Sequence, residues 1–132
     1  MKNRDITILM KIVQYADEIS GTINRFNLDF EKIKSDYVAK NAIAMCILQI
    51  GELANTLTDD FKSKHTKMPW REIVAMRNRA AHAYNSMDLE FLWNTAKINV
   101  PELEAYCEDV IEKDDLRILK EQGNSCNDTA SK

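Results

Sequence analysis

The chain has 132 residues, enough for one domain with its own core and too few for a multidomain machine. It contains three glycines and two prolines, whereas average usage gives roughly sixteen in this length. A fold of many short strands needs frequent turns and the glycines that make them, so this composition argues against all-β architectures. The formal net charge of −3 and the isoelectric point of about 5.4 by themselves argue against a nucleic-acid-binding protein.

The first half of the chain predicts two long helices. Apolar residues recur at helical spacing from about Arg4 to Asn24, which indicates an amphipathic helix. A connection follows, in which Asp29 to Lys34 can form one short turn of helix. The second long helix is expected over about Asp36 to Leu57, with Ser35 as its cap. Its wide apolar stripe has to be buried against other helices.

A polar and basic link precedes a third helix. Thr58 to Lys67 is expected to be irregular or a short helix, and Pro69 suits the first position of the helix that follows. This helix is predicted to end at His82 or Tyr84, because Asn85 tolerates the left-handed turn that ends a helix.

A fourth helix follows, for which Asp88 is a suitable cap. Its apolar positions continue to Ile111, although Pro101 lies inside it. Proline lacks the N–H of one backbone hydrogen bond, so we expect a kink near Lys97 to Ile98 that does not end the helix.

These elements predict an all-α fold, an antiparallel bundle of four to five helices over residues 1–113, with residues 114–132 as a polar, poorly ordered C-terminal tail. The longest apolar run, Ala42 to Leu48, is far shorter than the roughly 18 residues of a membrane span, and the first residues contain no signal-peptide core. A soluble, cytoplasmic protein is therefore expected. The three cysteines lack metal-ligand spacing and predict reduced thiols, two of them in the core.

The charge is distributed unevenly along the chain. Between Phe61 and Tyr84 there are six basic residues and one acid, a local balance of +5, which leaves −8 for the rest. Both histidines, His65 and His82, fall in the same stretch. Such a segment can bind phosphate even on an acidic protein, because the field that matters is local. On charge alone, a solvated face of lysines and arginines is the simpler interpretation.

The residues that can carry chemistry lie in the string RNRAAHAY, residues 77–84, of the third helix. On a helix, Asn78, Arg79 and His82 share one face, and Arg77 and Tyr84 share another. His82 can move a proton near neutral pH, and the Arg77 guanidinium can bind phosphate oxygens. This pair suits cleavage of RNA by its own 2′-hydroxyl, with the arginine stabilising charge on the phosphate oxygens.

The geometry of this helix allows two ways for Arg77 and His82 to act on the same phosphate. Arg77 and His82 point about 140° apart on an ideal helix, so a shared phosphate requires the helix to end early or a second subunit to contribute.

For His82 alone, a buried structural histidine is the simpler interpretation. Its grouping with Arg, Asn and Tyr favours a chemical role.

The residues that other classes of enzyme need for catalysis are missing from this sequence. A metal-dependent nuclease needs carboxylates or histidines that converge on one point, and the acids near the motif, Glu72 and Asp88, are better explained as a surface charge and a helix cap. Oxyanion turns, phosphate-binding loops and dinucleotide-binding fingerprints all need glycines, and this chain has too few of them to form one. We therefore predict no metal and no cofactor.

The string RNRAAHAY resembles the signature of HEPN-domain ribonuclease toxins of the HepT type, which is Arg, four residues, His, any residue, Tyr. These toxins are partners of minimal nucleotidyltransferase antitoxins. The resemblance covers about Arg4 to Glu112 and includes Ile50-Gly51-Glu52, Met68 to Ile73, Asp88-Leu89-Glu90, Trp93 and Pro101-Glu102-Leu103. Ala83 departs from the family at a spacer position where many members have Gly.

The resemblance implies a dimeric HEPN-like bundle and a metal-independent RNA endonuclease, the toxin of a type VII-like toxin-antitoxin pair. It implies Arg77 and His82 as the catalytic pair, with Asn78 and Arg79 supporting the site and Arg71 as a further RNA-binding residue. Tyr84 matches the tyrosine to which the antitoxin attaches AMP, and an anionic nucleotide there would block RNA from the cationic site.

Three alternatives remain open at this point. The chain can be a non-catalytic, nucleotide-binding partner subunit of a nucleotidyltransferase. The motif can be a structural network of polar residues between helices, and Tyr84 can be a rim tyrosine that only caps the dimer cleft.

Overall fold

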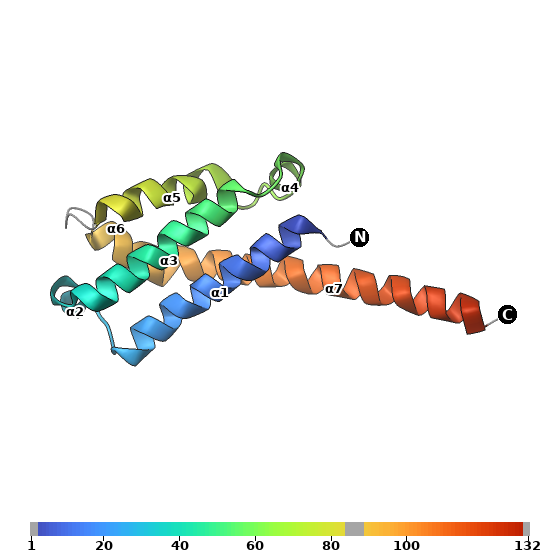
Figure 1. Ribbon diagram of the computed structural model, residues 1–132, viewed down its shortest axis with the longest axis horizontal. Helices are drawn as coiled ribbons and strands as arrows, with labels where there is room; N and C mark the ends of the chain where they lie inside the picture. The colour runs from blue at the N-terminus through green and yellow to red at the C-terminus, as the bar shows by residue number, and fades with distance from the viewer. Residues whose placement is uncertain (1–2, 84–88, 131–132) are drawn as a thin grey trace.

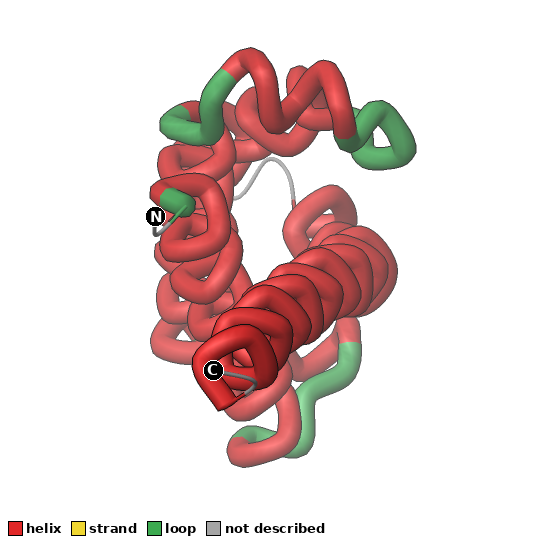
Figure 2. The backbone as a smooth tube through the Cα atoms, turned by 90° about the vertical axis from the view of Figure 1, so that its right-hand side faces the viewer, coloured by secondary structure: helices red, strands yellow, loops and turns green. Residues whose placement is uncertain are grey.

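The computed structural model describes residues 3–83 and 89–130, and for residues 82, 83 and 124–130 it describes the backbone only. The described secondary structure is entirely helical, with no strand in these residues (Figure 2). In chain order the elements are α1 (Arg4–Arg25), α2 (Phe30–Ser35), α3 (Tyr37–Asn55), α4 (Asp59–Lys64), α5 (Trp70–Ala83), α6 (Leu89–Asn94), the π-helical turn η1 (Thr95–Asn99) and α7 (Val100–Ala130).

The long elements form an antiparallel bundle. Along the chain, α1, α3, α5 and the continuous α6–η1–α7 segment alternate in direction (Figure 1). Helix α3 packs against α1 on one side and α5 on the other, and α1 also packs against α7. The shared core is built mainly from isoleucine, leucine and alanine of these helices. The predicted all-α bundle is therefore confirmed.

Side-chain caps fix where the helices begin. The Asp29 carboxylate accepts a hydrogen bond from the backbone N–H of Lys32 at the start of α2. At the start of α3 the cap is Asp36, whose carboxylate accepts from the N–H of Ala39 at 3.0 Å. The prediction that Ser35 caps this helix is wrong, because Ser35 is the last residue of α2 and its hydroxyl donates back to the carbonyl of Lys32.

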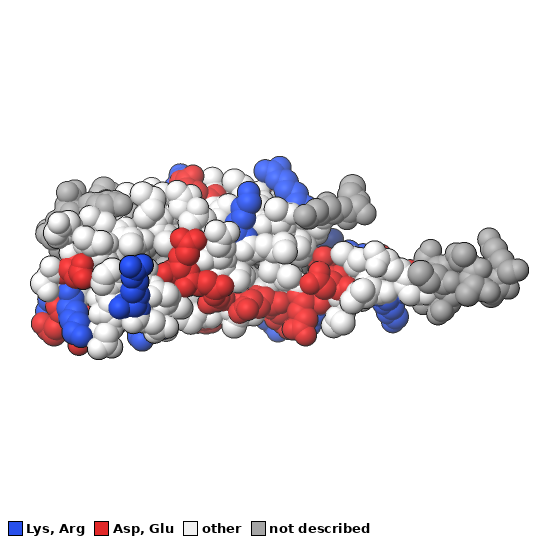
Figure 3. Space-filling view, turned by 60° about the horizontal axis from the view of Figure 1, so that its bottom comes forward, with Lys and Arg blue, Asp and Glu red and all other residues white. Residues whose placement is uncertain are grey.

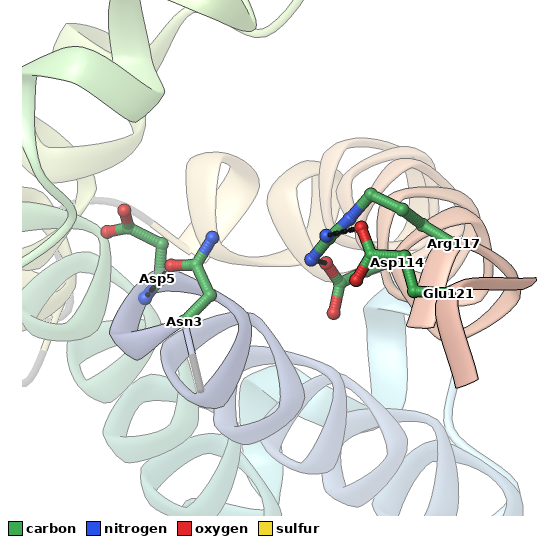
Figure 4. A network of polar contacts seen from close by, with 5 residues as sticks. All are labelled: Asn3, Asp5, Asp114, Arg117 and Glu121. Atoms are coloured by element: carbon green, nitrogen blue, oxygen red, sulfur yellow. Dashed lines mark hydrogen bonds and ion pairs between the residues drawn. The ribbon is translucent and has the colours of Figure 1, made fainter. Parts of the chain in front are cut away.

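Asp5 connects the start of α1 to the start of α4. Its buried carboxylate accepts hydrogen bonds from the backbone N–H and the hydroxyl of Thr58, at 2.8 and 2.7 Å. The Thr58 hydroxyl in turn accepts from the N–H of Phe61 and caps α4. Asn3 caps α1 next to this carboxylate (Figure 4). This network fixes α4, and with it the connection that leads into α5.

The helix around Pro101 is distorted where the sequence predicts it. The residues just before the proline, Thr95 to Asn99, form the π-helical turn η1, and the helix then continues as α7. Pro101 cannot donate to the carbonyl of Lys97, so the wider turn accommodates a missing backbone hydrogen bond. The predicted continuation of the helix past Pro101 is confirmed and the turn before it is π-helical, whereas the kink stays a prediction.

Helix α7 continues to Ala130 and projects beyond the bundle (Figure 1), where the sequence predicts a poorly ordered tail. Arg117 pairs with Asp114 at 3.1 Å and with Glu121 at 2.8 Å (Figure 4), which are ion pairs between neighbouring turns. Such pairs stabilise a helix without tertiary contacts. The domain boundary at residue 113 stays a prediction. Among the described helices, none combines the length and apolar character needed to cross a bilayer.

Candidate active site

The motif occupies the C-terminal half of α5. The carbonyl of Pro69 accepts from the N–H of Ile73 in the first turn, and the buried Trp70 anchors this end of the helix. The helix continues without interruption through His82 to Ala83. The expected helix end at Asn85, the cap at Asp88 and the modification site Tyr84 lie outside the described residues, as does the side chain of His82.

Helices α3 and α5 approach each other closely at Gly51. A Cβ atom added to Gly51 would lie 2.9 Å from the Cβ of Arg77 and 3.0 Å from its backbone nitrogen. A glycine in a helix interior costs about 1 kcal/mol relative to alanine, and here it permits this close approach. The crossing places the backbone of Arg77 directly against α3.

The same crossing gives Arg77 a partner. Its Nη1 donates to Oε1 of Glu52 at 2.6 Å, and the two side chains are 36% and 48% exposed. A guanidinium has five N–H groups, so one contact through Nη1 leaves donors of the right geometry for a phosphate. The site therefore contains an arginine that is oriented by a carboxylate and lies at the surface.

Glu52 is a site residue that the sequence reasoning did not assign. The signal for it was the unusual glycine just before it in an otherwise apolar helix, within the Ile50-Gly51-Glu52 segment that also carries the family resemblance.

Arg79 lies on another side of α5. Its guanidinium carbon is 3.9 Å from the centre of the Phe91 ring of α6, within cation–π distance. Asn78 is exposed on the same helix, and Arg71 is exposed in its first turn, about 9 Å along the helix axis from Arg77. The structure thus places Arg77 beside α3 and Arg79 beside α6. Phe91, which contacts Arg79, is the second residue near the motif, after Glu52, to which the sequence reasoning assigned no role.

The other histidine of the basic stretch has a structural position. Nδ1 of His65 lies 2.8 Å from the Tyr106 hydroxyl, its ring stacks on Phe61 at 4.1 Å, and its carbonyl accepts from the Trp70 indole N–H at 2.8 Å. Burial lowers the pKa of His65 and outweighs the opposing effect of Asp5. His65 holds the α4–α5 connection against α7.

Within the described part of the chain, no three His, Cys, Asp or Glu side chains gather where they could hold a metal ion. Cys46 and Cys107 are free and buried, and burial raises their pKa to about 11 and about 12. Such thiols stay protonated at neutral pH. The prediction of two core-filling cysteines is confirmed.

An all-α bundle whose basic helix carries an ion-paired arginine five residues before a histidine is consistent with the HEPN type that the sequence resembles. Comparison with known protein families agrees, because the family model described as "Ribonuclease HepT-like" matches residues 12–110. The chain belongs to this HepT-like ribonuclease family and is an RNA-cleaving enzyme.

Individual relatives carry corresponding names. A protein of Methanocaldococcus jannaschii named "Putative RNase MJ1216" is 30% identical over 112 residues, which cover 84% of this chain and 91% of the relative. A protein of Thermococcus cleftensis named "Probable ribonuclease HepT" is 36% identical over 74 residues, 56% of this chain and 67% of the relative. No solved structure matches the chain.

Proposed function

We propose that this chain is a metal-independent RNA endonuclease in which Arg77 and His82 act on one phosphate. The observation that carries the proposal is the ordered Arg77, held at the surface of the motif helix by Glu52. The sequence from Phe61 to Tyr84, which contains Arg77, carries a local charge of +5 on a chain that is acidic elsewhere. Asn78, Arg79 and Arg71 supply further polar and cationic groups along the same helix.

The chemistry follows from the two side chains. His82 accepts the proton of a ribose 2′-hydroxyl, whose oxygen attacks the adjacent phosphorus, and the bond to the 5′-oxygen of the next nucleotide breaks. The leaving oxygen takes up a proton, and the products are a cyclic phosphate and a 5′-hydroxyl. Arg77 stabilises the negative charge that builds on the phosphate oxygens, because its rigid fork binds two of them at once.

A homodimer supplies the geometry that one helix lacks. The sequence leaves two ways to bring Arg77 and His82 to one phosphate, and α5 does not end before His82. On α3, Val38 and Met45 precede Glu52 at seven-residue spacing, so the three lie on one face. Val38 is 54% and Met45 47% exposed. These exposed apolar side chains, on the face of α3 that also carries Glu52, suit contact with a second subunit.

In this proposal the chain is the toxin of a type VII-like pair, and a nucleotidyltransferase antitoxin controls its activity. Addition of AMP to Tyr84 would put an anion next to the cationic motif and exclude RNA. The face formed by α1 and α7 carries a cluster of acidic side chains (Figure 3), among them Asp17, Glu104 and Glu108. Such a face suits a basic partner in the cytoplasm.

RNA cleavage by the purified chain in the presence of EDTA tests the proposed chemistry. We expect cleavage by the wild type, loss of cleavage in Arg77→Ala and His82→Ala with unchanged melting temperature, and full activity in the control Arg25→Ala, an exposed arginine at the end of α1. Cleavage that persists in His82→Ala contradicts the mechanism. A chain that binds a nucleotidyltransferase and cleaves no RNA would be the non-catalytic subunit instead.

The intact mass of the chain after co-expression with a nucleotidyltransferase encoded beside it tests the control mechanism. We expect an increase by one or more AMP units that disappears in Tyr84→Phe. An unchanged mass, or an increase that persists in this variant, contradicts the assignment of Tyr84.

A further inference from the structure

A pocket that the proposed cleavage chemistry does not use lies between α5 and the α6–η1–α7 segment. Its volume is about 340 Å³. Ile73, Thr95 and Leu103 are buried residues of its lining, and Glu72 and Glu102 are exposed at its edge. An apolar cavity of this size with a few polar groups around it is typical of a binding site for a small molecule or cofactor.

An arginine and an aromatic ring that stack on each other line the pocket. Arg79 and Phe91 both line it, and the guanidinium carbon lies 3.9 Å from the ring centre. Aromatic rings and arginine planes are the groups on which proteins stack unpaired RNA bases. Arg79 precedes His82 by three residues, about 4.5 Å along the helix, so a base held here would be close to the motif.

The wall opposite α5 is the π-helical turn η1. Thr95 and Asn99, at the two ends of this turn, both line the pocket. Pi-helical turns occur frequently at functional sites, where they change the direction of side chains relative to a regular helix. The turn therefore places two polar residues, Thr95 and Asn99, in a wall that also contains the apolar Phe91 and Leu103 and the acidic Glu102.

We propose that this pocket binds a nucleobase stacked on Phe91 and Arg79, with the carboxylates of Glu72 and Glu102 accepting hydrogen bonds from its edge. Carboxylates accept N–H groups, so guanine, with two adjacent donors, fits better than uracil, whose single donor is flanked by carbonyl oxygens. The base comes from the RNA substrate or from a free nucleotide. In its RNA form, the proposal rests on the ribonuclease function proposed above.

Methionine methyl groups give a direct test, because Met68 and Met76 line the pocket, whereas Met10 and Met45 are exposed on α1 and α3. The full chain with ¹³C-labelled methionine methyls is titrated with guanosine monophosphate and with uridine monophosphate. We expect guanosine monophosphate to shift the Met68 and Met76 signals, leave those of Met10 and Met45 unchanged, and bind about tenfold more tightly than uridine monophosphate.

Two variants remove the groups that the proposal uses. Phe91→Ala removes the stacking ring and is expected to weaken binding about 5- to 100-fold. Glu102→Gln changes an exposed side chain, so it keeps the fold, and is expected to weaken guanosine monophosphate about tenfold with little effect on uridine monophosphate. The control is Glu90→Gln, an exposed neighbour of Phe91 in sequence that is not among the residues lining the pocket.

Cleavage kinetics separate the two sources of the base. A raised KM for RNA in Phe91→Ala and Glu102→Gln assigns the pocket to the substrate, whereas unchanged kinetics with weakened guanosine monophosphate binding assign it to a free nucleotide. Shifts of Met68 and Met76 in a chain that cleaves no RNA would support the pocket and contradict the ribonuclease mechanism. Absence of these shifts at saturating nucleotide, or equal binding by wild type and both variants, overturns the proposal.

Discussion

The contact between α3 and α5 at Gly51 yields a sharp prediction for Gly51→Ala. The new Cβ would lie 2.9 Å from the Cβ of Arg77, about 0.6 to 1 Å closer than carbon atoms prefer, and 3.3 Å from the carbonyl oxygen of Ile73. The atoms it meets are backbone or close to it, so the helices have to separate. Overpacking of this kind costs about 1–3 kcal/mol, and the better helix propensity of alanine returns about 1 kcal/mol.

The matched control is Gly21→Ala in α1, where an added Cβ meets nothing within 4 Å. This variant is expected to stabilise the protein by about 0.5–1 kcal/mol. Urea unfolding followed by circular dichroism should therefore show changes of opposite sign, about 1–3 kcal/mol apart. Because Arg77 moves with α5, Gly51→Ala should also slow RNA cleavage, by up to about 100-fold. Equal stabilisation by both substitutions would refute the close crossing.

Three further predictions concern polar groups of the bundle. Glu52→Gln should lower kcat about tenfold and leave KM within about twofold, because the Arg77 guanidinium loses the carboxylate that orients it. The free energy of unfolding should change by less than about 1 kcal/mol. Unchanged kinetics would contradict a positioning role for Glu52. Asp5→Ala should cost about 1–3 kcal/mol in urea unfolding, since the N–H and the hydroxyl of Thr58 lose the carboxylate that accepts from both, and a cost near zero would contradict this. Burial and Asp17 raise the pKa of Glu104 from 4.5 to about 7, so the folded chain holds a proton that the unfolded chain has released, and stability falls as pH rises through this window. Glu104→Gln should therefore be more stable than wild type at pH 8, by about 1 kcal/mol after solvent screening, and equal to it at pH 4; a pH-independent difference would contradict the assignment.

The helices could be predicted because their evidence is local. Apolar spacing located α1 and α3 to within about two residues, and Pro101 located the distortion before α7. The choice between Ser35 and Asp36 as a cap could not be made, because both can cap and only the end of α2 decides between them. The polar composition of residues 114–132 predicts a poorly ordered tail, which stays a prediction; ion pairs one turn apart accompany the helical backbone there.

The candidate site was predictable only in part. The motif itself can be read from the sequence, and residues 77–83 of it lie on one helix, α5. Glu52 and Phe91 lie 25 residues before Arg77 and 12 residues after Arg79, so their contacts arise from the packing of α3 and α6 against α5, which no local pattern specifies. His65 lies in the same basic stretch, and its contacts with Phe61 and Tyr106, which come from the packing of α4 and α7, show that its position is structural.

The central claim is that Arg77 and His82 of two subunits act on one phosphate, and mixing two inactive variants tests it most directly. Arg77→Ala and His82→Ala are each purified, unfolded together, refolded as a mixture and assayed for RNA cleavage in EDTA beside wild type treated in the same way. If the two residues come from different subunits, half of the dimers are mixed and each has one intact site of two, so the mixture regains about a quarter of wild-type activity. A mixture as inactive as its components, under conditions where refolded wild type cleaves RNA, would contradict the shared site.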